Sequence, residues 1–158
     1  MDLFENTSTE LFYLASRESS LTDPEYRYKI SNPIISVCGK KGNRTTLFEN
    51  SEYYSEKLGI PSIYFGKYIS NKISCPQFID KEKKCISWKG EYTREQIEMY
   101  LKDFIKIYIL CPNCDYPETN LYLNNKQLGQ LCRSCGASSL IETKYMDKTF
   151  DFIQKNIK

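Results

Sequence analysis

Two Cys-x-x-Cys motifs constrain this chain more than any other feature. Cys111 and Cys114 form the first motif, and Cys132 and Cys135 form the second after 17 intervening residues. Each motif places two sulfurs on one tight turn, and this spacing is typical of a four-thiolate zinc ribbon. Four thiolates close a tetrahedron and leave no open position for water or substrate, so we expect one structural zinc ion. A disulfide pair and a redox Cys-x-x-Cys are the alternatives. Both are disfavoured, because nothing suggests secretion and a redox motif needs no second pair.

Composition excludes several classes of enzyme. The 158 residues contain no histidine, which removes Ser-His-Asp and Cys-His catalysis and most hydrolytic zinc sites. No Gly-x-x-x-x-Gly-Lys-Ser/Thr loop is present to cradle a nucleotide. The 22 Lys and Arg against 20 Asp and Glu give a formal net charge of +2, too small to indicate nucleic-acid binding by itself. We therefore expect a protein without an active site of its own.

Hydrophobic patterning predicts an α+β fold in two units. We expect a flexible arm at 1–22, a mixed α/β sheet domain at 23–106 and a small all-β zinc ribbon at 107–158. The expected strands of the sheet domain are 34–38, 45–48, 62–69, 77–79 and 85–88. The expected strands of the ribbon are 120–123, 130–131 and 149–153.

Two helices are expected in the sheet domain. Asn50 is a candidate N-cap for the first helix, which Gly59 would end. Thr93 and Gln96 form a capping box that opens the second helix. An apolar stripe at helical period follows, consisting of Ile97, Tyr100, Leu101, Phe104, Ile105 and Tyr108. We expect residues 108–110 to turn extended and to lead into Cys111.

The loop at 39–44 is the strongest candidate for contact with nucleic acid. It joins two predicted strands and contains two glycines beside Lys40, Lys41, Asn43 and Arg44. Cations of this kind meet phosphates, and glycines let the backbone approach them closely. The alternative is a solvated hairpin tip. Such contacts would position the partner without reading its sequence.

A larger set of residues resembles a known family. Residues 109–114, 117–121 and 132–136 resemble the zinc-ribbon signature shared by eukaryotic initiation factor 5 and the beta subunit of initiation factor 2, and Pro117-Glu118-Thr119 is its most specific part. Further matches at 42–43, 50, 61 and 64–66 extend the resemblance upstream. It implies that the sheet domain resembles initiation factor 1.

The segment Tyr26-Arg27-Tyr28-Lys29 resembles initiation factor 5 more than the beta subunit. The resemblance implies that Arg27 is an arginine finger that activates GTP hydrolysis by initiation factor 2 during start-codon selection. A guanidinium suits this role because it stays charged and offers paired donors to phosphoryl oxygens. Ile63 stands where the family carries a lysine.

The resemblance also implies partners: the gamma subunit of initiation factor 2 with GTP, initiator methionyl-tRNA and rRNA of the small ribosomal subunit. We expect a cytoplasmic protein that lacks the carboxyl-terminal helical-repeat domain of initiation factor 5. Two alternatives remain open. One is a scaffold like the beta subunit, without GTPase activation, and the other is a zinc-ribbon protein that binds nucleic acid in transcription.

Overall fold

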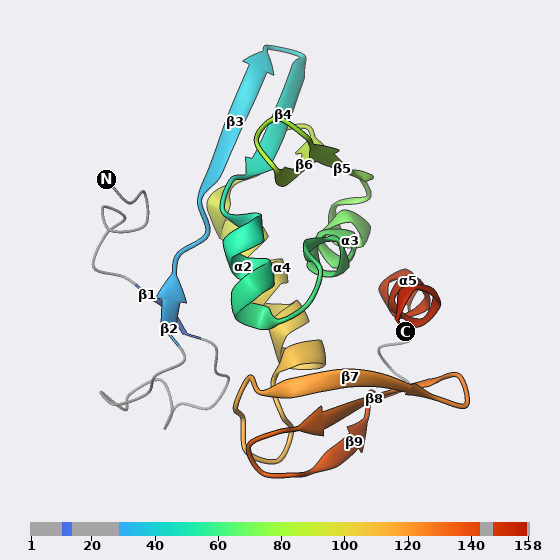
Figure 1. Ribbon diagram of the computed structural model, residues 1–158. Helices are drawn as coiled ribbons and strands as arrows, with labels where there is room; N and C mark the ends of the chain where they lie inside the picture. Colours follow the sequence, from blue (N-terminus) through green and yellow to red (C-terminus); the bar gives the residue numbers. More distant parts are fainter. Residues whose placement is uncertain (1–10, 14–28, 143–146, 158) are drawn as a thin grey trace.

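The computed structural model describes residues 11–13, 29–142 and 147–157. Its helices and strands make a mixed α+β fold, with a sheet at one end and a three-stranded ribbon at the other (Figure 1). The elements in chain order are β1 (Leu11–Tyr13), β2 (Lys29–Ser31), β3 (Ile35–Lys40), β4 (Asn43–Phe48), α2 (Ser51–Leu58), α3 (Ser62–Ile73), β5 (Gln77–Asp80), β6 (Cys85–Lys89), α4 (Arg94–Phe104), the π-helix η1 (Ile105–Ile109), β7 (Thr119–Asn124), β8 (Gln127–Cys132), β9 (Ser138–Leu140) and α5 (Lys148–Asn156).

The main sheet has the strand order β3-β4-β6-β5. Its neighbouring strands all pair antiparallel, so the expected mixed sheet is an antiparallel one. The strands expected at 34–38, 45–48, 77–79 and 85–88 are confirmed as β3, β4, β5 and β6. β3 and β4 form a tight hairpin in which Lys40 pairs with Asn43, and β1 pairs with β2 in a separate two-stranded sheet.

The strand predicted at 62–69 is wrong, because these residues begin helix α3. Their aromatic and branched side chains have high strand propensity, but Tyr64, Phe65, Tyr68 and Ile69 are all buried on one face at helical spacing. Trp88 lies beneath this helix and donates a hydrogen bond from Nε1 to Gly66 O at 3.4 Å. Burial against the core therefore overrides local propensity.

Aromatic side chains join the sheet to the helices. The ring centroids of Phe48 and Phe65 are 5.8 Å apart, those of Phe65 and Phe104 are 6.2 Å apart, and those of Phe104 and Tyr108 are 5.0 Å apart. All four residues are almost fully buried. This core packs β4, α3 and the α4–η1 helix against one another.

The capping box of α4 is confirmed. Thr93 Oγ1 accepts from Gln96 N at 3.2 Å, and Gln96 Oε1 accepts from Thr93 N at 3.0 Å. The helix then runs further than expected, because Ile105–Ile109 form a π-helix that ends with a hydrogen bond from Leu110 N to Ile105 O at 2.9 Å. Extended backbone begins only at Leu110, so the expected switch at 108 is wrong by two residues. The reason is the burial of Tyr108 and Ile109 in the same core.

The ribbon has the strand order β7-β8-β9, and its neighbouring strands pair antiparallel. This confirms the strands expected near 120–123 and 130–131. The strand predicted at 149–153 is wrong, because helix α5 occupies this segment. Asp147 caps it by accepting from Thr149 N at 2.9 Å and from Phe150 N at 3.0 Å. The helix packs on α3, where the rings of Tyr64 and Phe152 meet edge to face with centroids 6.1 Å apart. The expected domain boundary between the sheet domain and the ribbon, at residue 106, stays a prediction.

Candidate metal centre and hairpin loop

The structure brings the four predicted cysteines into one cluster. The Sγ atoms of Cys111, Cys114, Cys132 and Cys135 all lie within 4.8 Å of one another. The Cys111–Cys135 and Cys114–Cys132 sulfur separations are 3.6 and 3.7 Å. A tetrahedron with metal–sulfur bonds of about 2.3 Å has sulfur–sulfur edges of about 3.8 Å, whereas a disulfide requires about 2.05 Å. The geometry therefore fits four ligands of one ion.

The two cysteine turns have the same backbone geometry. Asp115 N donates to Cys111 O at 2.8 Å, and Gly136 N donates to Cys132 O at 3.0 Å. Asp115 and Gly136 occupy the same place in their turns, and both have left-handed φ values, of 63° and 76°. Glycine adopts this conformation without strain, whereas an aspartate does so less readily. The repeat of this geometry indicates that the two turns are equivalent halves of one site.

The Pro117-Glu118-Thr119 segment connects the turns to the rest of the protein. Thr119 Oγ1 donates to Ile109 O at 2.5 Å, which satisfies a carbonyl at the end of the π-helix. Glu118 O accepts from Arg133 N at 2.8 Å, inside the second cysteine turn. One short segment therefore contacts both the helix that delivers Cys111 and the turn that carries Cys132 and Cys135.

The four thiols differ in their surroundings. Cys111 and Cys132 are buried, Cys114 is half-buried and Cys135 is exposed. Burial raises the pKa of Cys114 to about 12. Hydrogen bonding, first of all from the Asn113 side chain, lowers the pKa of Cys135 to about 6. Because metals bind thiolates, a cation at the centre would stabilise the charged form of Cys114 that its surroundings disfavour.

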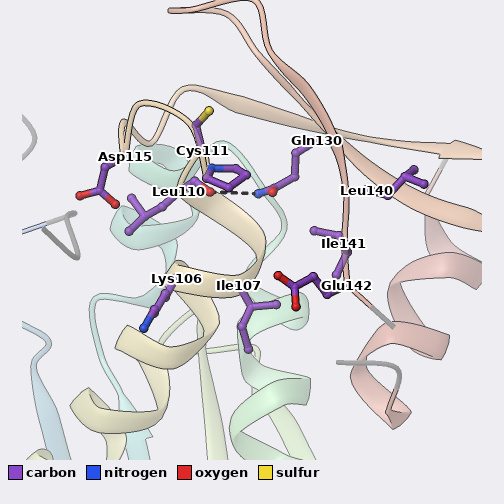
Figure 2. Close-up of a pocket in the computed structure, with 10 residues that line it drawn as sticks. Lys106, Ile107, Leu110, Cys111, Asp115, Gln130, Leu140, Ile141 and Glu142 are labelled. Atoms are coloured by element: carbon purple, nitrogen blue, oxygen red, sulfur yellow. Dashed lines mark hydrogen bonds between the residues drawn. The ribbon is translucent and has the colours of Figure 1, made fainter. Parts of the chain in front are cut away.

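A cavity of about 220 Å³ lies beside Cys111, between the π-helix and the ribbon (Figure 2). Gln130 of β8 crosses it and donates from Nε2 to Leu110 O at 3.4 Å. Gln130 is buried, and its amide links the central ribbon strand to the residue before the first cysteine. The residues that line this cavity therefore help to position Cys111.

The hairpin residues predicted to contact nucleic acid lie together at the tip of β3 and β4. Lys40, Lys41 and Asn43 are exposed, and the Arg44 side chain is 40% exposed. Arg44 Nη1 forms an ion pair with Glu91 Oε2 at 2.9 Å. The pair leaves the two lysines as the uncompensated cations of the four predicted residues.

The structure adds residues to this tip that sequence analysis missed. A cavity of about 470 Å³ is lined by Lys41, Asn43 and Arg44 together with Lys89 and Glu91. The β4–β6 pairing places Lys89 opposite Thr45, and Gly90 N donates to Arg44 O at 2.7 Å. No local pattern signals this neighbourhood, because it depends on which strands pair.

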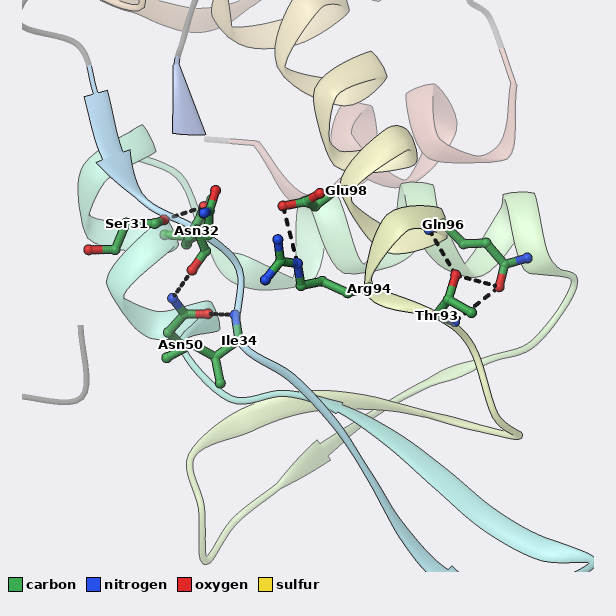
Figure 3. Close-up of polar contacts among 9 residues, drawn as sticks. Ser31, Asn32, Ile34, Asn50, Thr93, Arg94, Gln96 and Glu98 are labelled. Atoms are coloured by element: carbon green, nitrogen blue, oxygen red, sulfur yellow. Dashed lines mark hydrogen bonds and ion pairs between the residues drawn. The ribbon is translucent and has the colours of Figure 1, made fainter. Parts of the chain in front are cut away.

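Arg27 lies outside the described residues. The described chain resumes at Lys29, and hydrogen bonds with Asn50 hold the backbone of Asn32 and Ile34 at the start of α2 (Figure 3). Tyr54 donates its hydroxyl to Ser31 O at 2.6 Å, and the Tyr53 hydroxyl accepts from Ser31 N at 3.2 Å. Burial raises the pKa of Tyr54 well above its usual value, so the hydroxyl stays protonated as this donor. The cap of α2 expected from the Asn50 side chain is not formed. The side chain bonds to the backbone of Asn32 and Ile34 instead.

The antiparallel sheet, the helical core and the four-cysteine cluster define a small α+β protein whose cysteines are arranged as in a zinc ribbon and could hold one metal ion. No helix within the described residues combines the length and the apolar character needed to cross a membrane. Residues 18–138 match the eIF-5/eIF-2B family, which is described as a domain found in initiation factors 2B and 5. The chain belongs to this family, as its zinc-ribbon signature indicated.

Individual relatives are named as initiation factor 5. The chain is 30% identical over 137 residues to "Eukaryotic translation initiation factor 5" of Caenorhabditis elegans, a match covering 87% of this chain and 31% of the relative. It is 31% identical over 139 residues to the protein of the same name from Mus musculus, covering 87% and 32%. It is 29% identical over 139 residues to "Probable eukaryotic translation initiation factor 5-1" of Arabidopsis thaliana, covering 87% and 31%. The chain thus spans about a third of the length of these curated relatives.

Proposed function

We propose that this protein is a translation initiation factor of the factor 5 type, which promotes GTP hydrolysis by initiation factor 2 on the small ribosomal subunit during start-codon selection. The observation that carries the proposal is its similarity to proteins named initiation factor 5 over 87% of its length. It acts inside its partner's nucleotide site and needs no active site of its own.

Arg27 is the proposed arginine finger. Its guanidinium enters the nucleotide site of the gamma subunit and stabilises the negative charge that spreads over the phosphoryl oxygens in the transition state. Fixed anchors to Ser31, Asn32 and Ile34 support this role, because they hold the chain a few residues beyond Arg27. A finger that starts from a fixed point loses less conformational entropy when it enters its site.

The hairpin tip is the proposed contact with initiator methionyl-tRNA or with rRNA of the small subunit. Lys40 and Lys41 would meet phosphates, Asn43 would add a neutral hydrogen-bonding group, and Arg44 would join them when its ion pair with Glu91 opens. One zinc ion at the four cysteines is proposed to hold the ribbon together, with no part in chemistry, because four protein ligands fill its coordination.

Single-turnover GTP hydrolysis on the initiation factor 2 ternary complex, bound to the small subunit, tests the proposal. Arg27→Ala is expected to lower the stimulated rate by roughly 10³-fold or more, since arginine fingers contribute on this scale. Arg27→Lys should recover only a small part, because lysine lacks the paired donors. Lys155→Ala removes an exposed positive charge on α5 and serves as the control, with a rate expected to be unchanged.

Equal rates for the unchanged protein and Arg27→Ala, with binding to the complex retained, would leave a scaffold like the beta subunit of initiation factor 2. The description of the matching family covers initiation factor 2B as well as initiation factor 5, which favours this second candidate over unrelated functions. Failure to bind any initiation complex, together with binding to DNA, would support the transcription alternative.

A further inference from the structure

A second basic cavity is lined by residues of helices α3 and α5. These two helices lie side by side, away from the tip of the β3–β4 hairpin (Figure 1). The cavity has a volume of about 550 Å³, and it shares no lining residue with the cavity at the tip. Lys67 and Lys72 line it from α3, and Lys148 lines it from the first turn of α5. We propose that this cavity binds phosphate groups of an RNA backbone. The inference depends neither on Arg27 nor on GTP hydrolysis.

The three lysines carry charge that the described protein does not neutralise. The ion pairs of the described ranges join Arg44 to Glu91 and Arg94 to Glu98, and neither involves this cavity. The one carboxylate in the lining belongs to Asp147, which accepts from Thr149 N and Phe150 N at the start of α5. Asp147 is therefore already engaged by positive backbone dipoles, and the cavity stays electropositive.

The walls of the cavity are preorganised. Asn71 Nδ2 donates to Thr149 Oγ1 at 2.7 Å, a bond that joins α3 to α5, and Thr149 is fully buried. Lys67 Nζ lies 5.8 Å from the centroid of the Phe152 ring, and Lys72 Nζ lies 5.2 Å from that of Tyr68. The Lys67 contact reaches from α3 to α5, and both rings restrict the flexible lysine stems. Binding an anion there loses less side-chain entropy than binding to free surface lysines.

The chemistry of the lining favours phosphodiester RNA over an acidic peptide. Besides the lysines, the cavity presents the amide of Asn71 and the exposed Ser74 at the end of α3, which suit the several oxygens of a phosphate. Tyr68 is buried, so its ring is closed to base stacking. The cavity should therefore hold the backbone without reading the sequence.

Binding of the full chain to a labelled single-stranded RNA of about 12 nucleotides tests the inference, measured by fluorescence anisotropy across a salt series. The triple variant Lys67→Gln/Lys72→Gln/Lys148→Gln is expected to bind about tenfold more weakly or worse at about 0.1 M salt. The slope of log affinity against log salt should shrink by about 2, at about 0.7 for each phosphate that the variant no longer neutralises. Unchanged thermal unfolding would show that the variant folds normally.

The matched control is Lys81→Gln/Lys83→Gln/Lys84→Gln, which removes the same charge from exposed lysines on the turn between β5 and β6. It should lower the affinity by less than about threefold. A site-specific readout comes from NMR, in which RNA should shift the amide signals of Ser74 and Lys148 in the unchanged protein.

Three results would overturn the inference. In the first, the cavity variant binds RNA as tightly as the control variant. In the second, the amides of Ser74 and Lys148 stay unshifted while those of the hairpin tip move, which would assign all RNA binding to the tip. In the third, a polyglutamate peptide of equal charge binds the cavity as tightly as RNA, which would make it a site for acidic protein.

Discussion

Asn50 holds Ile34 in place through a partly buried hydrogen bond. Its Oδ1 accepts the backbone N–H of Ile34 at 2.8 Å, and its Nδ2 donates to Asn32 O at 3.0 Å. Asn50 is only 4% exposed, and its bond to Asn32 O is buried. The amide thereby joins the chain between β2 and β3 to the start of α2.

Replacing Asn50 with alanine should destabilise the fold. The variant leaves the Ile34 N–H and the Asn32 carbonyl without these partners, and unsatisfied buried groups cost about 1–3 kcal/mol each. We expect Asn50→Ala to lower the free energy of unfolding by about 2–4 kcal/mol in urea titrations. Asn120→Ala, at an exposed position of β7, is the control and should change it by less than about 0.5 kcal/mol. Equal effects of the two substitutions would show that the Asn50 bonds contribute nothing.

The cysteine cluster should contain one zinc ion per chain. Elemental analysis of purified protein should give this stoichiometry, and Cys114→Ser should lose the ion. A chelator should unfold the ribbon, because a small three-stranded sheet has little core without its metal. Cys38→Ser, which changes an exposed cysteine outside the cluster, should keep both zinc and fold. Metal-free protein with an intact ribbon would argue against a structural zinc site.

Zinc binding should weaken as the pH falls. The pKa of Cys114 is raised to about 12 by burial, so its proton must leave when the metal binds, whereas the pKa of Cys135 is already lowered to about 6. Competition with a coloured chelator between about pH 8 and pH 6 should show the apparent affinity decreasing toward the acid end. Calorimetry in buffers of different ionisation enthalpy should show proton release. An affinity independent of pH would contradict thiolate ligation.

Gly129 should be essential to the ribbon because of Tyr122. The Tyr122 ring lies so close to Gly129 that an added Cβ would overlap it, and the Tyr122 hydroxyl meets Ser138 Oγ at 2.6 Å across the sheet. We expect Gly129→Ala to cost about 1–3 kcal/mol of stability, as overpacking usually does. In a Tyr122→Ala background the same substitution should cost much less. A double-mutant cycle measures this coupling, and additive effects would disprove it.

Glu91 should restrain RNA binding by the hairpin tip. Its ion pair with Arg44 is partly exposed, so Glu91→Gln should change stability by less than about 1 kcal/mol. The variant frees the Arg44 guanidinium for phosphate and removes a repelling charge, so RNA affinity at low salt should rise about two- to fivefold. Glu56→Gln, at an exposed position of α2, makes the same charge change as a control. An equal rise in both variants would reflect net charge alone.

Elements with a dominant local signal are the ones that the sequence predicts well. The capping box of Thr93 and Gln96, the hairpin around Gly42 and the β5 and β6 strands are confirmed, because each depends on residues close together in the chain. Helices α3 and α5 were missed for a common reason. Both present aromatic and β-branched residues that favour strands locally, and their helical form is stabilised by burial against the core and against each other.

The sequence alone determined the family and the four candidate ligands, since the cysteine spacing and the Pro117-Glu118-Thr119 segment are readable without any structure. Tertiary structure alone decided that Arg44 pairs with Glu91, that Lys89 joins the hairpin tip, and that three lysines from α3 and α5 share one cavity. The physical reason is that ion pairs and cavities depend on distances in space between residues far apart in the chain. Packing of the core sets those distances, and local propensity and residue spacing carry no information about them.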